Sequence, residues 1–134
     1  MSPRIRSRRA NPVRRTPAAK GVGQKRPAYR YVSPGEAAVI RASQPSRVPN
    51  LDLSGKPKFV YFTWDLYKKV ARAESALRIG ACHPAGPFSS PSDRVRIELA
   101  GITYTYLGIV PGETGTELRT PDSPLVLTIT ALIP

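Results

Sequence analysis

The chain has few of the residues that catalytic and metal sites require, with one cysteine and one histidine among 134 residues. A single cysteine excludes an internal disulfide framework, and with a single histidine it cannot complete a zinc site. Cys82 and His83 are adjacent, and neighbours on an extended chain point to opposite faces, so we expect no thiolate–imidazole pair. The sequence therefore predicts a protein that is not an enzyme and has no catalytic residues, metal or cofactor.

Long apolar runs are also lacking. No segment approaches the roughly 18 apolar residues of a membrane-spanning helix. The N-terminal residues likewise lack the apolar core of a signal peptide. We therefore expect no membrane partner and no secretion.

Acidic residues are missing from the first quarter of the chain. The first acidic residue in the sequence is Glu36. Ten of the 21 Lys and Arg residues lie in the first thirty positions. The remaining residues hold eleven cations and all nine acidic residues, so they contribute only +2 (11 − 9) to the net charge of +12. The positive charge is therefore a property of one segment.

Residues 1–30 are predicted to form an extended basic arm. Pro3, Pro12, Pro17 and Pro27 interrupt any helix, each at a cost of about 3 kcal/mol inside one. The segment has too few large apolar residues to bury a core. A solvated tail or a targeting segment is the alternative, although the prolines oppose the amphipathic helix of a mitochondrial transit peptide.

Arginine dominates this arm, and guanidinium groups match phosphate oxygens two at a time and stack on bases. An arginine-rich segment without acids favours a nucleic acid, RNA or DNA, as the partner. The expected nucleic-acid-binding residues are Arg4, Arg6, Arg8, Arg9, Arg14, Arg15, Lys20, Lys25, Arg26 and Arg30.

Two tyrosines stand where the arm meets the rest of the chain. Tyr29 and Tyr31 flank Arg30 and would lie on the same side of an extended segment. They could stack on unpaired bases or, as the equally favoured alternative, cover the edge of the domain.

Residues 31–57 are predicted to form an irregular connector, in which the apolar run 37–40 suits a strand or one helical turn. Residues 58–134 predict a compact β-rich domain with one helix at about residues 64–79. Thr63 would be its N-cap and Gly80 its C-terminal stop. Its apolar stripe would consist of Leu66, Val70, Ala73 and Leu77.

The polar side of that helix carries Lys68, Lys69 and Arg72, which could make secondary phosphate contacts. A solvated face with ion pairs four residues apart is the favoured alternative. Those pairs would join Asp65 to Lys69 and Glu74 to Arg78.

Several strands are expected in the rest of the domain. Residues 58–64 read as a buried strand, and Gly101 would reverse a hairpin between residues 94–99 and 102–110. Residues 125–133 would form the last strand. One core would contain Val95, Ile97, Leu99, Leu125, Leu127 and Ile129 together with Leu66, Val70 and Leu77. The predicted fold is mainly β with one α-helix, a small antiparallel β-barrel or sandwich preceded by an extended basic N-terminal arm.

This layout of arginine-rich arm, wandering connector and small β domain resembles that of small viral, including phage, structural proteins associated with capsids. The resemblance implies a virion component, such as a capsid, cement, vertex or head-to-tail connector protein. Its arm would contact nucleic acid or neighbouring subunits, and its partners would include copies of itself in a large assembly. The alternative is a ribosomal protein in the cytoplasm whose basic extension binds rRNA. A free regulatory DNA-binding module is less favoured, because no helix-turn-helix is present.

Overall fold

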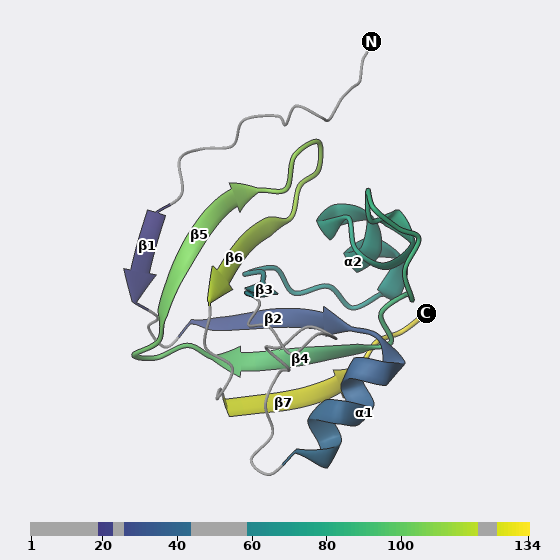
Figure 1. Cartoon of the computed structure of the whole chain (residues 1–134), viewed down its shortest axis with the longest axis horizontal. Coiled ribbons are helices and arrows are strands. Elements are labelled where there is room, and N and C mark those ends of the chain that lie inside the picture. Colours follow the sequence, from purple (N-terminus) through teal and green to yellow (C-terminus); the bar gives the residue numbers. More distant parts are fainter. Residues whose placement is uncertain (1–18, 23–25, 44–58, 121–125) are drawn as a thin grey trace.

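The computed structural model describes residues 19–22, 26–43, 59–120 and 126–134. Within these ranges the chain is mainly β, as predicted, with seven strands and two α-helices (Figure 1). In chain order the elements are β1 (Ala19–Val22), β2 (Pro27–Val32), α1 (Pro34–Ala42), β3 (Val60–Phe62), α2 (Val70–Leu77), the 3₁₀ turn η1 (Gly80–Cys82), β4 (Asp93–Glu98), β5 (Thr103–Ile109), β6 (Thr116–Thr120) and β7 (Val126–Ala131).

The strands form two antiparallel sheets, with the orders β1-β5-β6-β3 and β2-β4-β7. The sheets meet where Tyr29 and Thr63 exchange two backbone hydrogen bonds of 2.8 and 2.9 Å. Among the described strands, β1 and β7 each pair with one neighbour only, so no closed barrel forms. The barrel alternative is therefore wrong, and two sheets instead pack around a shared core.

The predicted hairpin across Gly101 is also wrong, although both of its strands exist. β4 pairs with β2 and β7, whereas β5 pairs with β1 and β6. The turn is tight, with Gly101 at φ +78° and a 2.8 Å bond from the Ile102 amide to the Leu99 carbonyl. Leu99 is fully buried and Ile102 packs against the same cluster, so the turn carries the chain from one sheet to the other around the core.

β1 and β2 lie within the range expected to be an extended arm. β2 is paired along its whole length with β4, and its Ala28 and Val32 are buried. The structure thus differs from the expectation for these two strands, because pairing and burial order a segment that has no strong strand pattern of its own. Residues 1–18 lie outside the described residues, and an arm there stays a prediction.

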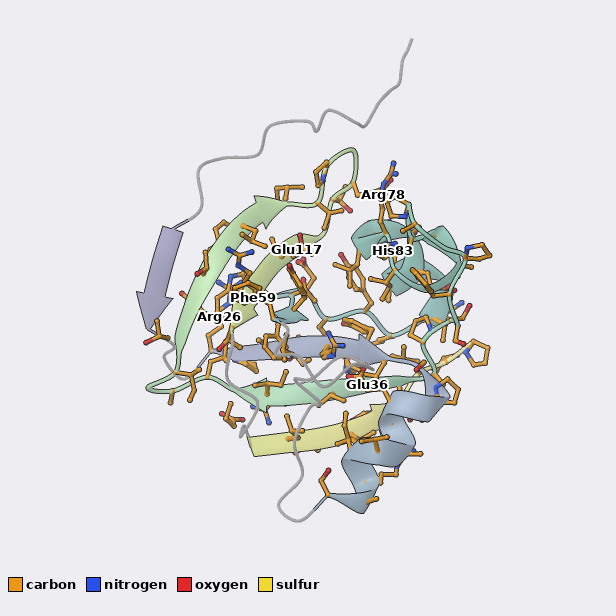
Figure 2. The ribbon with its side chains drawn as sticks, viewed as in Figure 1. Arg26, Glu36, Phe59, Arg78, His83 and Glu117 are labelled. Carbon is orange, nitrogen blue, oxygen red and sulfur yellow. The ribbon has the colours of Figure 1, made fainter. Side chains whose placement is uncertain are left out.

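α1 occupies part of the range expected to be an irregular connector, so the described residues form two α-helices rather than one. The Ser33 hydroxyl accepts a hydrogen bond from the Glu36 amide, and Pro34 suits the first turn. Ala37 and Ile40, three residues apart, are both buried. Glu36 projects beside β2 (Figure 2). Residues 44–58, the remainder of that connector, lie outside the described residues.

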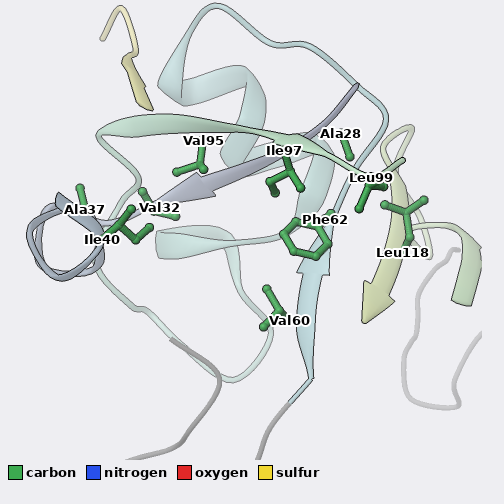
Figure 3. Packing of buried hydrophobic residues seen from close by; sticks show 10 residues of the cluster. All are labelled: Ala28, Val32, Ala37, Ile40, Val60, Phe62, Val95, Ile97, Leu99 and Leu118. Carbon is green, nitrogen blue, oxygen red and sulfur yellow. The ribbon is translucent and has the colours of Figure 1, made fainter. Parts of the chain in front are cut away.

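The main core, shown in Figure 3, lies between the two sheets and α1. The predicted alternation of β4 is confirmed, because Val95, Ile97 and Leu99 are all fully buried. Leu127 and Ile129 of β7 pack against this cluster as expected, and Leu125 lies outside the described residues. The other buried members are Ala28, Val32, Ala37, Ile40, Val60, Phe62 and Leu118.

α2 does not pack on that core. Ala28 and Val32 of β2 lie in the main core. Tyr31 of the same strand lies in a second cluster with Ala73 of α2 and Leu132. Val70 and Leu77 pack against this second cluster, whereas Leu66 is 52% exposed. The prediction of one common core for the helix stripe and β4 is therefore wrong.

The helix is also shorter than expected, because the segment before it is held by side-chain hydrogen bonds. Asp65 Oδ2 accepts bonds from the Thr116 amide at 2.7 Å, the Thr116 hydroxyl at 2.8 Å and the Thr63 hydroxyl at 2.9 Å. The Ile133 amide donates to the Lys68 carbonyl at 3.0 Å. Thr63 thus belongs to this network rather than capping a helix, and α2 begins only at residue 70.

Candidate nucleic-acid interface

Two cations of the predicted arm, Arg26 and Arg30, make contacts within the fold. The Arg26 guanidinium lies 4.3 Å from the centre of the Trp64 ring. Arg30 forms two bonds, of 2.7 and 2.9 Å, to the Glu36 carboxylate and donates to the Tyr61 carbonyl at 3.0 Å. Arg30 is therefore a positioning residue. Lys20 lies in β1 opposite Thr105, and the other predicted arm residues, Arg4, Arg6, Arg8, Arg9, Arg14, Arg15 and Lys25, lie outside the described residues.

Tyr31 is not available to stack on a base, because it is only 8% exposed. Its hydroxyl donates to the Asp65 carbonyl at 2.7 Å and accepts from the Tyr67 amide at 2.6 Å. Burial raises the pKa of Tyr31 to about 12. Tyr29 shares its face of β2 and is half-buried, with the Arg94 guanidinium 5.7 Å from its ring centre. Tyr31 is thus a buried member of the second cluster with Ala73 and Leu132, and Tyr29 packs against this cluster.

Lys68, Lys69 and Arg72 are exposed, but only Arg72 lies on α2. Arg72 donates to the Thr114 hydroxyl at 3.1 Å, and its guanidinium lies 5.7 Å from the centre of the Tyr67 ring.

The two ion pairs expected on this helix are not seen among the described residues. The Asp65 carboxylate is instead engaged by Thr63 and Thr116. Glu74 Oε2 accepts from the Ala81 amide at 2.9 Å, and Arg78 faces Glu113.

The sequence reading missed an aromatic and cationic surface on the outside of the four-stranded sheet. Alternation in β3 buries Val60 and Phe62 in the main core and leaves Tyr61 on the outside, 39% exposed, with Phe59 just before the strand also exposed. Arg119 of β6 pairs in register with Tyr61, and its guanidinium lies 4.2 Å from the centre of the Phe59 ring. We call Phe59, Tyr61 and Arg119 the outer-face patch.

The signal for this patch was present in the segment KFVYFTW. Side chains of a strand alternate between its two faces, and here the residues of each face include aromatic side chains. An interpretation of the whole run as buried could not separate the two sets. Only the partner strands decide which set faces the core.

A groove of about 660 Å³ adjoins the outer-face patch. Tyr61, Leu107 and Glu117 line it from the sheet, Arg78 and His83 line it from the segment after α2, and Arg30 also contributes. Figure 2 shows Arg78 and His83 on the α2 side and Glu117 on the β6 side. Cationic and acceptor groups therefore stand on opposite walls of one groove.

Arg78 and His83 line the groove from the α2 wall. Arg78 Nε makes no hydrogen bond within the described residues, and it lies 3.6 Å from the nearest Glu113 oxygen. His83 Nδ1 accepts from the Ala85 amide at 3.0 Å, which places the proton of a neutral ring on Nε2. The ring also packs edge-on against Phe88, with 5.0 Å between ring centres.

The described residues show no arrangement for metal binding. In the four described ranges, no group of three or more His, Cys, Asp and Glu side chains is placed to hold a metal ion. Cys82 is exposed in η1, and His83 follows it at the C-terminal end of that turn. None of the described helices has the length and apolar character to cross a membrane.

Comparisons of the chain with protein-family models, with curated proteins and with solved structures return no match.

Proposed function

We propose that the chain is a non-enzymatic structural component of a virion, namely a capsid, cement, vertex or head-to-tail connector protein, whose basic N-terminal segment contacts nucleic acid. The observation that carries the proposal is the distribution of charge. Residues 1–18 contain six arginines and no acidic residue, and they precede β1, which is the edge strand opposite β3 in the four-stranded sheet.

The edge strand β7 supports the assembly part of this proposal. In the described structure β7 pairs with β4 alone, and its sequence VLTITA has no charged residue and no proline. Natural sheets usually protect such an edge with charges, prolines or bulges. An unprotected edge suits pairing with a neighbouring subunit, and a second copy of the chain offers the same strand for antiparallel pairing.

A ribosomal protein with an rRNA-binding extension is the second candidate. The outer-face patch favours it, because exposed aromatic side chains beside cations suit the unpaired bases of folded RNA. The two candidates differ in what the chain forms with nucleic acid. A virion component is expected to give discrete particles in sedimentation velocity with generic single strands, whereas a ribosomal protein is expected to bind structured rRNA fragments as a monomer.

The arm is tested by the salt dependence of binding. The full chain is compared with a variant in which Arg4, Arg6, Arg8, Arg9, Arg14 and Arg15 are replaced by Gln. Each lost phosphate contact lowers the slope of log K against log salt by about 0.7 on single strands, so six contacts correspond to about 4. A variant with Gln at Lys68, Lys69 and Arg72 is the control, with an expected change below about 1. Equal slopes for the arm variant and the full chain would refute the proposal.

A further inference from the structure

We propose that the groove between the outer sheet face and the segment after α2 holds one unpaired base of a single-stranded nucleic acid. The base lies against Tyr61 and Leu107, and an adjoining phosphate lies at Arg78 and His83. This inference rests on the proposed nucleic-acid function and specifies the form of the ligand, single strand rather than duplex.

The dimensions and lining of the groove suit a base. Its volume of about 660 Å³ falls within the roughly 300–1,000 Å³ typical of small-ligand sites. Tyr61 and Leu107 provide ring and aliphatic surface, and Leu77 and Ile79 face them from the α2 side. Every base has a flat face that stacks on such surfaces, so this wall accepts an unpaired base of any kind.

Tyr61 is held at this position by its neighbours in the sheet. Its carbonyl accepts a hydrogen bond from Arg30, which is itself fixed by two bonds to Glu36. The backbone at Tyr61 pairs with Arg119 of β6. These contacts fix the backbone of β3, which presents the exposed Tyr61 side chain to the groove.

The phosphate is expected on the α2 wall. The Arg78 side chain is 40% exposed. One of its terminal nitrogens lies close to Gly112, 3.3 Å from the position that a Cβ atom would take there. Arg78 Nε is buried and lies 3.6 Å from a Glu113 oxygen, so a phosphate would meet the terminal nitrogens of the guanidinium rather than Nε. His83 offers Nε2–H beside it. The proposed strand therefore places its phosphate toward the α2 wall and its base toward Tyr61 on the sheet.

This arrangement selects single strands, because a base can reach Tyr61 only when its face is free of a stacked neighbour. A duplex presents its phosphates to the arm but keeps its base faces covered. The arm and the groove are therefore expected to differ in the nucleic acid that they prefer. The arm binds any polyanion, and the groove adds affinity for single strands alone.

The test uses the full chain with a fluorescently labelled single-stranded RNA of ten nucleotides and a duplex of equal length. Binding is measured by anisotropy at a salt concentration high enough to weaken arm contacts. We expect Tyr61→Leu to weaken single-strand binding roughly 5- to 100-fold, the range that stacking of one base on an aromatic ring provides. Duplex binding should stay within about twofold. Tyr61→Phe keeps the ring and should retain single-strand binding.

The phosphate wall is tested with Arg78→Gln, which should also weaken single-strand binding. Arg96→Gln is the matched control, because Arg96 is an equally charged, exposed residue of β4 that pairs with Glu98 at 3.3 Å and does not line the groove. Single-strand affinities of Tyr61→Leu and Arg78→Gln within about twofold of the parent would overturn the proposal.

Ultraviolet crosslinking locates the base independently of affinity. Trypsin releases Tyr61 in the peptide 59–68, and we expect a crosslinked nucleotide at Tyr61 in the parent chain. Crosslinks confined to residues outside this peptide would refute the groove site even if a variant failed to fold. The outcomes also separate the two proposals, because a normal arm slope with unaffected Tyr61 and Arg78 variants rejects the groove alone. A Tyr61 effect with an unchanged arm slope rejects the arm alone.

Discussion

Replacing Tyr31 with Phe distinguishes a tyrosine that supports the fold from one that binds a base. The substitution removes only the hydroxyl, which donates to the Asp65 carbonyl at 2.7 Å and accepts from the Tyr67 amide at 2.6 Å. Each such hydrogen bond contributes about 1 kcal/mol net to stability. The Asp65 carbonyl and the Tyr67 amide would also be left without their hydrogen-bond partner. We expect a loss of about 2–3 kcal/mol in the free energy of unfolding and a fall in Tm on the order of 10 °C.

The pH dependence provides a second measurement on the same variant. Because the pKa of Tyr31 is about 12 in the folded chain and 10.0 for an ordinary tyrosine, the neutral phenol stabilises the fold. That contribution is fully present below pH 10 and is lost as the pH rises toward 12. The stability difference between the parent and Tyr31→Phe should therefore shrink across this interval.

The assay is urea unfolding followed by tryptophan fluorescence, repeated between pH 7 and about pH 11.5. Tyr29→Phe is the matched control, because no hydrogen bond of the Tyr29 hydroxyl is found within the described residues. We expect its stability to stay within about 0.5 kcal/mol of the parent. If Tyr31→Phe at pH 7 is as stable as this control, the hydroxyl is not holding the segment before α2 and the reasoning is wrong.

Two other substitutions probe the core and the network before α2. Ile97→Ala should cost about 2–5 kcal/mol by urea unfolding, because Ile97 is fully buried between the sheets, and a loss below about 1 kcal/mol would place that face at a surface. Burial alone would raise the pKa of Asp65, but hydrogen bonds from Thr116 and Thr63 and the charge of Arg26 together lower it below 3.8. Ionised Asp65 therefore stabilises the fold above about pH 4, and this stabilisation is lost as the pH falls through the folded pKa of Asp65. The loss of stability in Asp65→Asn should therefore be largest near neutral pH and shrink in acid. A loss of stability that does not change with pH would contradict this account.

Alternation of apolar and polar residues was sufficient to predict several strands from the sequence. Val95, Ile97 and Leu99 alternate with charged residues, and the side chains of a strand alternate between its two faces whatever its partners are. The β-rich character and the last strand followed in the same way. The charge of the first eighteen residues is likewise a property of composition and needs no fold.

Partner choice and the positions of turns were decided by tertiary structure. Gly101 marks a reversal in the sequence, but a tight turn can join two strands of one sheet or carry the chain between sheets. Burial of Leu99 selects the second outcome. In the same way, the helical pattern of residues 64–79 is cut short because Asp65 bonds to Thr116, a residue distant in the sequence.

The candidate site depends most on such distant contacts. The composition of KFVYFTW predicts a strand, but only pairing with β6 and contact with the main core turn Val60 and Phe62 inward and leave Tyr61 outside. The groove brings together residues from β3, β6 and the segment after α2, and no local pattern specifies their distances. The amino-acid sequence by itself therefore determined a basic segment, a β-rich domain and its alternating faces. The tertiary structure alone decided which faces are covered, because burial depends on the partner that each strand and helix meets.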